Sequence, residues 1–222
     1  MNLVIPNPCV ALVTDRSLSG GLDGLKEAVE AAVEGGVTMV QLREKDLDIQ
    51  DLFQFAQKLR LITDGKALLF VNDRVDIAVA SHADGVQLGE RGMSIDQARM
   101  TIGNRRLLIG RSVHDVQGGL RAVHSGADLL YAGTIFPSKS HPGQPANGIE
   151  LIRALTMQVN VPVFGIGGIT KTNSRDVIDA GAQGVAVISE IFAALDPFDA
   201  AKGLREAVDN AYAAVKSAPP MG

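Results

Sequence analysis

Cysteine and the large aromatic residues are scarce in this chain. Cys9 is the single cysteine, which excludes an intrachain disulfide and any metal site built from several cysteines. Tryptophan is absent and aromatic residues make up only 4% of the sequence, so a core must be built chiefly from Val, Ile, Leu and Ala. With 46% hydrophobic residues among 222, the chain has enough apolar material for such a core.

An excess of positive charge and long apolar runs are lacking as well. The formal net charge is -4, which argues against nucleic acid as the main partner, because binding to a phosphate backbone needs clustered Lys and Arg. No uninterrupted apolar run is long enough to span a bilayer. The apolar start contains Pro6 and Pro8 and lacks the basic residues of a signal peptide. We therefore expect a cytoplasmic protein that binds small molecules and no membrane.

Short apolar runs alternate with longer segments of helical periodicity along the whole chain. The runs are almost continuously apolar, which is typical of parallel strands that are covered on both faces. They comprise residues 9–14, 38–42, 67–71, 85–88, 107–110, 129–133, 161–166 and 184–188. A helical pattern follows each run, and several of these patterns end in Gly.

This order of segments predicts an α/β protein that folds as a (β/α)8 TIM barrel. Eight units in a chain of this length fit a single domain over residues 1–222, with a frayed tail at residues 219–222. The alternative is a doubly wound open sheet, but no G-x-G-x-x-G motif opens the first helix. The carboxyl ends of barrel strands carry the active site, so polar residues that follow a strand are the candidates for function.

Polar side chains follow the second and third strands. Gln41, Arg43 and Lys45 alternate, and side chains at a period of two lie on one side of a strand. We expect them to form one wall of a pocket, although a charged strand end that only meets water is the alternative. Asn72 and Asp73 follow the third strand, where they either bind a ligand or a metal or cap the next helix.

Segments after the seventh and eighth strands predict a phosphate site. Gly167 and Gly168 lack a Cβ and allow an anion to approach the backbone. Ile188 and Ser189 lie where a short helix begins, and the N–H groups of such a helix start bind phosphate in many barrels.

A long loop rich in Gly, Pro and Ser follows the sixth strand over residues 133–148. Long loops in compact domains are usually lids, binding loops or disordered segments, and we expect a mobile lid here. Ser138, Ser140 and His141 lie within this loop.

Seven short segments, spaced along the predicted strands, form a pattern that is more specific than any one of them. They are VQLREK, VNDRVDIA, GVQLGE, IGRSVHD, YAGTIFP, VPVFGIGGIT and GVAVISEIF. In this order they resemble the superfamily that contains thiamine-phosphate synthase and thiazole tautomerase. The resemblance implies a (β/α)8 barrel with a pocket for a thiazole phosphate. It also implies that the substrate contacts Gln41, Arg43, Lys45, Asn72, Gln87, Ser112, Ser138 and Ser140, and that its phosphate contacts Gly167, Gly168, Ile188 and Ser189.

The two branches of this superfamily perform different reactions. The synthase joins a pyrimidine methyl diphosphate to thiazole phosphate with Mg²⁺ and releases pyrophosphate. The tautomerase moves a proton to make a carboxylated thiazole phosphate aromatic, and it needs neither a diphosphate nor a metal. In the synthase pattern an Asp ligand of Mg²⁺ stands at position 92 and a Lys for the diphosphate at position 141, whereas this chain has Gly92 and His141. Gln87 replaces a His, and VQL and GRSVH resemble the tautomerase branch.

On these differences we expect a thiazole tautomerase, an isomerase that needs no cofactor. The resemblance places His114 as its catalytic acid–base, and histidine suits proton transfer near neutral pH. Arg43 and Lys45 then hold the substrate carboxylate. Two alternatives stay open: a thiamine-phosphate synthase with Mg²⁺ at Asp73, and a non-catalytic phosphate-binding regulator on the same scaffold. The sequence leaves the oligomeric state open, a homo-oligomer included.

Overall fold

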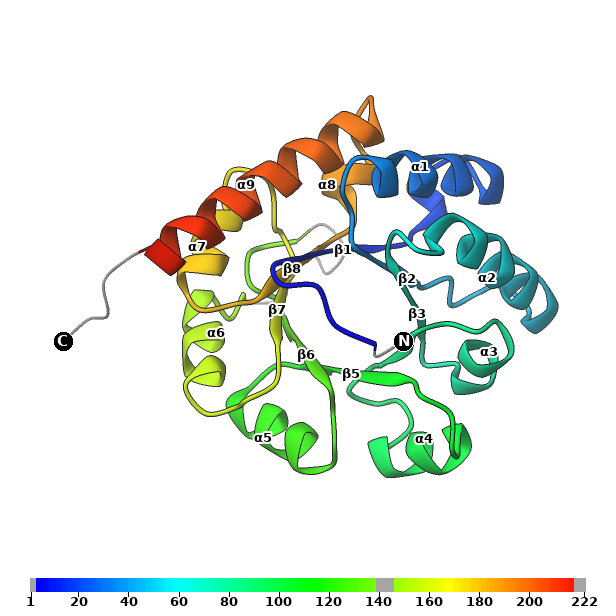
Figure 1. Cartoon of the computed structure of the whole chain (residues 1–222), viewed down its shortest axis with the longest axis horizontal. Coiled ribbons are helices and arrows are strands. Elements are labelled where there is room, and N and C mark those ends of the chain that lie inside the picture. Colours follow the sequence, from blue (N-terminus) through cyan, green and yellow to red (C-terminus); the bar gives the residue numbers. More distant parts are fainter. Residues whose placement is uncertain (1–2, 139–145, 218–222) are drawn as a thin grey trace.

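The eight apolar runs form parallel strands that close into a barrel (Figure 1). The computed structural model describes residues 3–138 and 146–217, so the expected tail at residues 219–222 lies outside the described residues. Each strand pairs with its neighbours in the sequence, and β1 closes on β8. The strands are β1 (Cys9–Val13), β2 (Met39–Leu42), β3 (Leu68–Asn72), β4 (Gly85–Leu88), β5 (Leu108–Val113), β6 (Leu129–Gly133), β7 (Val163–Ile166) and β8 (Gly184–Val187). The predicted (β/α)8 barrel is confirmed, and the open sheet is excluded.

Helices surround the barrel and connect its strands (Figure 1). Asp48, Ser94 and Asp115 begin three of them, each with its side chain accepting a hydrogen bond from a backbone N–H three residues later. A 3₁₀ turn, η1 (Arg16–Leu18), follows β1. The helices are α1 (Leu22–Glu34), α2 (Ile49–Thr63), α3 (Val75–Ala80), α4 (Ile95–Ile102), α5 (Val116–His124), α6 (Ile149–Thr156), α7 (Ser174–Asp179), α8 (Ser189–Phe192) and α9 (Pro197–Ser217).

Successive side chains of a strand point alternately into the barrel and towards the helices, which gives two apolar layers. Val10 and Leu12 of β1 belong to the larger layer between strands and helices. The inner layer consists of Cys9, Ala11, Val13, Met39, Phe70, Leu129, Tyr131, Phe164 and Ala186. Because these side chains fill the barrel, they form a packed floor beneath the carboxyl ends of the strands.

The fifth strand extends further than the sequence predicts. Its apolar run ends at residue 110, but β5 continues through polar residues to Val113. Arg111 pairs with Leu88 of β4, and Val113 pairs with Ala132 of β6. Pairing with both neighbouring strands therefore extends β5 through these polar residues, and Ser112 lies within the strand.

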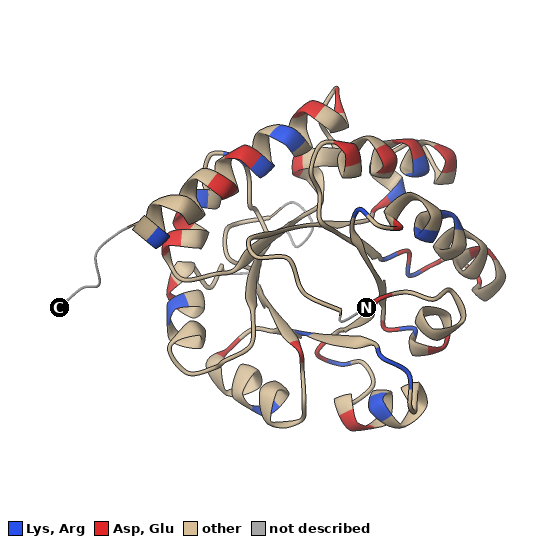
Figure 2. Cartoon of the chain, in the orientation of Figure 1, with Lys and Arg blue, Asp and Glu red and all other residues tan. Residues whose placement is uncertain are grey.

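Residues of both charge signs occur along the outer helices (Figure 2). This mixture agrees with the small net charge of -4. Within residues 3–138 and 146–217, no helix combines the length and the apolar character needed to cross a membrane. The cytoplasmic location stays a prediction.

Candidate functional site

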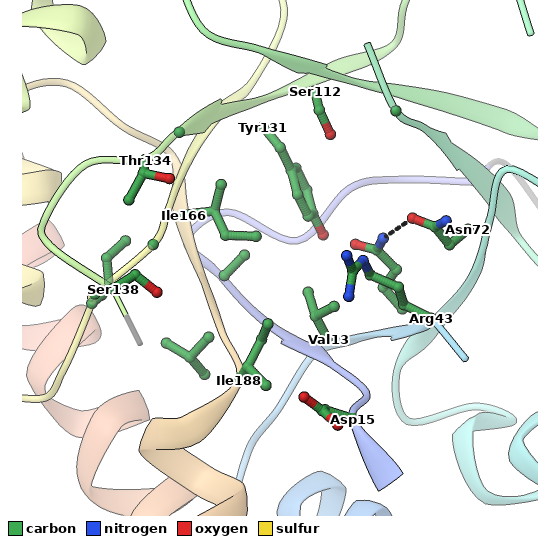
Figure 3. A pocket seen from close by; sticks show the side chains of 18 of the residues that line it. Val13, Asp15, Arg43, Asn72, Ser112, Tyr131, Thr134, Ser138, Ile166 and Ile188 are labelled. Carbon is green, nitrogen blue, oxygen red and sulfur yellow. Dashed lines mark hydrogen bonds between the residues drawn. The ribbon is translucent and has the colours of Figure 1, made fainter. Parts of the chain in front are cut away.

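A cavity of about 370 Å³ opens at the carboxyl ends of the strands, where the sequence predicts the active site (Figure 3). Most of the predicted site residues line it: Gln41, Arg43, Lys45, Asn72, Asp73, Ser112, His114, Ser138, Gly167, Gly168, Ile188 and Ser189. Gln87 is buried next to Ser112 instead of lining the cavity. Ser140 and His141 lie outside the described residues, as does most of the expected lid.

Several residues that line the cavity escaped the sequence analysis. They are Val13, Asp15, Gly89, Glu90, Tyr131, Gly133, Thr134, Ile166, Ile169, Ala186 and Val187. Most of the apolar ones are inward-facing members of strands, and periodicity alone does not distinguish them from the packed floor below. Asp15 and Glu90 follow strand ends, a position that could have identified them.

An amide network joins β2, β3 and the segment after β4. Gln41 Nε2 donates to Asn72 Oδ1 at 3.0 Å, and Asn72 Nδ2 donates to Asp73 Oδ2 at 2.9 Å. The other carboxylate oxygen of Asp73 accepts from the backbone N–H of Gly89 at 2.7 Å. Arg74 is the residue that begins α3, and its side chain makes no capping bond. Asn72 and Asp73 therefore face the site and do not cap the helix.

A second amide lies beneath the cavity, in β4. The Gln87 side chain is 1% exposed, and its Nε2 donates to Ser112 Oγ at 3.1 Å. Because Ser112 Oγ accepts this bond, the Ser112 hydroxyl can donate its own hydrogen to a different acceptor. Among the described residues, Oε1 of Gln87 and Oε1 of Gln41 are buried acceptors without a donor.

Arg43 and Lys45 form a cationic wall with no counter-ion among the described residues. The residues between them turn the other way: Leu42 joins the outer apolar layer, and the buried Glu44 pairs with Arg16 at 3.1 Å. Gln41, Arg43 and Lys45 all line the cavity, as their alternation predicts. Figure 3 shows the Arg43 side chain among those that line the cavity.

The glycine pair after β7 adopts backbone conformations that L-residues rarely reach. Gly167 has a φ of 98° and Gly168 a φ of 64°. A Cβ at Gly167 would lie 2.5 Å from Thr134 Cγ2, and one at Gly168 would lie 2.5 Å from the carbonyl oxygen of Pro137. The pair lies with Ile188 and Ser189 in the lining of the cavity, so the structure brings the predicted phosphate residues together.

His114 lies at the mouth of the cavity, where its side chain is 52% exposed. Its Nδ1 lies 2.7 Å from the carbonyl oxygen of Gly133, and since that oxygen only accepts, the ring donates through Nδ1. Asn147 Nδ2 donates to the carbonyl oxygens of Gly133 and His114 at 2.9 and 3.2 Å. On the other side, His114 Nε2 is 3.7 Å from Glu90 Oε2. The imidazole thus links the ends of β5 and β6.

Three carboxylates line the cavity, from Asp15, Asp73 and Glu90. Within residues 3–138 and 146–217, no three His, Cys, Asp or Glu side chains are grouped so that they could hold a metal ion. Gly92 leaves Asp73 without a neighbouring carboxylate at that position, and a Cβ there would lie 2.6 Å from Asp73 Oδ1.

Known proteins resemble this chain over most of its length. The family model for thiamine monophosphate synthase matches residues 10–191. A putative thiamine-phosphate synthase from Geobacter sulfurreducens is 47% identical over 196 residues, which cover 87% of this chain and 91% of the relative. The thiamine-phosphate synthase of Pyrococcus furiosus is 40% identical over 199 residues, with coverages of 89% and 93%.

Solved structures agree with this result. A thiamine phosphate pyrophosphorylase from Pyrococcus furiosus superimposes with a TM-score of 0.83 at 38% identity, covering 92% of this chain and 96% of that chain. A 3-hexulose-6-phosphate synthase superimposes with a TM-score of 0.68 over 90% of this chain, but at 17% identity this likeness shows the fold alone.

These findings overturn the expectation of a thiazole tautomerase. The relatives that are 40–47% identical are named as synthases, and none of them points to the isomerase branch. The isomerase assignment was wrong because it gave a few substitutions, chiefly Gly92, His141 and Gln87, more weight than the rest of the chain. The role of His114 as the acid–base of a tautomerase falls with it. This chain belongs to the thiamine monophosphate synthase family.

Proposed function

We propose that this chain is a thiamine-phosphate synthase, which joins a pyrimidine methyl diphosphate to a thiazole phosphate and releases pyrophosphate. The observation that carries the proposal is that one cavity has two separate regions suited to anions. Arg43 and Lys45 offer cationic side chains after β2, and the Gly167–Gly168 pair offers exposed backbone after β7. A reaction between a diphosphate and a phosphate needs two such regions. The names of the relatives support the same activity.

In this proposal the diphosphate binds at Arg43 and Lys45. The ring nitrogen of the thiazole forms a bond to the methylene carbon of the pyrimidine. The bond from that carbon to the diphosphate oxygen breaks, and its electron pair leaves with pyrophosphate. Negative charge therefore develops on the leaving group, where Arg43 and Lys45 stabilise it.

The thiazole phosphate binds on the wall formed by the segments after β7 and β8. Gly167 and Gly168 leave room for the phosphate, and Ser189 adds a hydroxyl at the start of α8. Apolar side chains also line the cavity, namely Val13, Tyr131, Ile166 and Ile188 (Figure 3). They exclude water, which would otherwise capture the reactive carbon in place of the thiazole.

Magnesium is the cofactor that the family resemblance implies, and the carboxylate pair expected at positions 73 and 92 is incomplete, because residue 92 is Gly. Mg²⁺ demands near-ideal octahedral geometry and is usually bound by one or two carboxylates together with substrate phosphates. Here Asp73 is the only carboxylate of the expected pair, and both of its oxygens accept hydrogen bonds from Asn72 and Gly89. We therefore assign no step of the reaction to a metal.

The direct test is turnover of the purified protein with a pyrimidine methyl diphosphate and a thiazole phosphate, with and without Mg²⁺. We expect thiamine phosphate and pyrophosphate in equal amounts. Arg43→Gln should lower kcat by about 10²–10³-fold, the usual loss when a group that stabilises transition-state charge is removed. Lys58→Gln, on the exposed surface of α2, is the matched control and should leave kcat unchanged. Binding of the thiazole phosphate without any product would contradict the proposal and favour a phosphate-binding regulator.

A further inference from the structure

The residues after β4 form a tight turn over Asp73, which we call the 89–93 turn (Gly89, Glu90, Arg91, Gly92 and Met93). Gly92 N donates to the carbonyl oxygen of Gly89 at 2.9 Å and closes the turn. The N–H of Gly89 donates to Asp73 Oδ1 at 2.7 Å, and Glu90 lines the cavity. The turn thus sets both the environment of the Asp73 carboxylate and the position of a second carboxylate.

Arg111 holds this turn from outside the barrel. Its neighbours in β5, Gly110 and Ser112, face inward, where Gly110 lies against Gln87 and Ser112 lines the cavity. Side chains alternate along a strand, so Arg111 points outward. Its guanidinium donates to the carbonyl oxygen of Glu90 at 2.8 Å and to that of Met93 at 2.9 Å.

The position of Arg111 follows from the strand register. Arg111 pairs with Leu88, the last residue of β4, so its side chain starts beside the point where the turn begins. No carboxylate among the described residues pairs with it, and the two carbonyl oxygens are the partners of its guanidinium in the turn. Charge-assisted hydrogen bonds of this kind are about twice as strong as neutral ones.

The turn has few other restraints. Two of its five residues are glycines, which gain the most backbone freedom when contacts are lost. Without Arg111 the turn keeps the bond between Gly92 and Gly89, the bond to Asp73, and the contact of Glu90 Oε2 with His114 Nε2 at 3.7 Å. The carbonyl groups of Glu90 and Met93 would then turn to water.

We propose that Arg111 is a positioning residue that holds the 89–93 turn. It keeps the hydrogen bond from the Gly89 N–H to Asp73 in place and keeps the Glu90 side chain in the lining of the cavity. It contacts none of the reacting atoms and acts only through the turn. The expected change in kcat rests on the proposed synthase activity. The expected change in amide hydrogen exchange does not depend on that activity.

Arg99 of α4 provides a matched control. It also donates to two backbone carbonyl oxygens, those of Leu107 at 2.8 Å and Gly126 at 3.0 Å. These residues precede β5 and β6, so Arg99 binds backbone carbonyl groups at the amino ends of the strands, opposite the site. Replacing either arginine removes two hydrogen bonds to the backbone, and replacing Arg99 also removes its ion pair with Asp128 at 2.5 Å. Only the replacement of Arg111 affects the turn.

The experiment compares Arg111→Gln, Arg111→Lys and Arg99→Gln by amide hydrogen exchange and by steady-state kinetics. We expect Arg111→Gln to raise exchange in residues 89–93 by about 10-fold or more and to lower kcat by about 10- to 100-fold, as a small misplacement of a site does. The KM for the thiazole phosphate should stay unchanged, because its phosphate binds across the cavity. Arg111→Lys should restore part of the protection and part of kcat. Arg99→Gln should lower the melting temperature while leaving exchange in the turn and kcat unchanged.

Native exchange in the turn of Arg111→Gln would overturn the inference, and so would a kcat equal to that of Arg99→Gln. If Arg111→Gln does not fold, Arg111→Lys carries the same comparison, since one donor is retained. If the parent protein makes no thiamine phosphate, the proposed function fails, and exchange in the turn still decides whether Arg111 holds it.

Discussion

At the scale of single residues, the neighbours of Gly110 require a glycine. A Cβ at this position would lie 1.9 Å from Gln87 Oε1, because the Gln87 side chain crosses the space above Gly110. Gln87 in turn donates to Ser112, which lines the cavity. Gly110 in β5 therefore leaves room for the Gln87 amide of β4, which orients the Ser112 hydroxyl in the site.

Gly110→Ala should displace Gln87 and break its hydrogen bond to Ser112. We expect the free energy of unfolding to fall by about 1–3 kcal/mol, the usual cost of overpacking a core, with kcat lowered as well. Chemical denaturation of the variant measures the first effect. In the background of Gln87→Ala, the same change should cost much less, because the clash has been removed. An equal cost in both backgrounds would show that Gln87 does not cause it.

At the scale of elements, the loops after β7 and β8 act together as one wall of the cavity. Gly168 has a φ of 64°, and a Cβ there would lie 2.5 Å from the Pro137 carbonyl oxygen. Gly103, at the end of α4, has a φ of 62° but no atom within 4 Å of such a Cβ. The two glycines have similar φ angles and differ in their surroundings.

Gly168→Ala should therefore weaken binding of the thiazole phosphate, whereas Gly103→Ala should not. Both changes place an alanine at a positive φ, which costs roughly 1–3 kcal/mol of stability. Only the first also moves the Pro137 segment that borders the site. Isothermal titration with the thiazole phosphate, at a temperature where both variants are folded, measures the difference. Equal affinities for the two variants would argue against a phosphate site at Gly168.

At the scale of the whole molecule, Cys9 lies in the packed interior of the barrel and is 0% exposed. Burial raises the pKa of its thiol to about 12, although a hydrogen bond from Thr38 lowers it in part. The thiol is therefore protonated near neutral pH, and reagents reach it only when the barrel opens.

A maleimide should thus leave the native protein unlabelled and modify one thiol per chain in denaturant. At intermediate denaturant, the labelled fraction should follow the loss of circular dichroism, because Cys9 reports opening of the whole barrel. Mass spectrometry measures the labelled fraction. Rapid labelling of the native protein would show that β1 separates from β2 and β8 without global unfolding.

The amino-acid sequence by itself determined the order of the elements and much of the site. Near-continuous apolar runs predict parallel strands because both of their faces are buried. A period of two placed Gln41 of β2, and Arg43 and Lys45 directly after it, in the lining of one cavity. Gly167 and Gly168 were recognisable for a similar reason, since a glycine pair at a strand end reflects a local backbone need. Such features depend only on residues close together in the chain.

Tertiary structure alone decided which distant groups meet. The bond from Gln87 to Ser112 and those from Arg111 to Glu90 and Met93 depend on the register between β4 and β5, which no local pattern specifies. The same register extended β5 through polar residues. The reaction was misjudged for a different reason: single substitutions such as Gly92 were given more weight than the similarity of the whole chain to the synthases. Periodicity encodes the direction of a side chain, whereas its partner depends on how the strands align when the barrel closes.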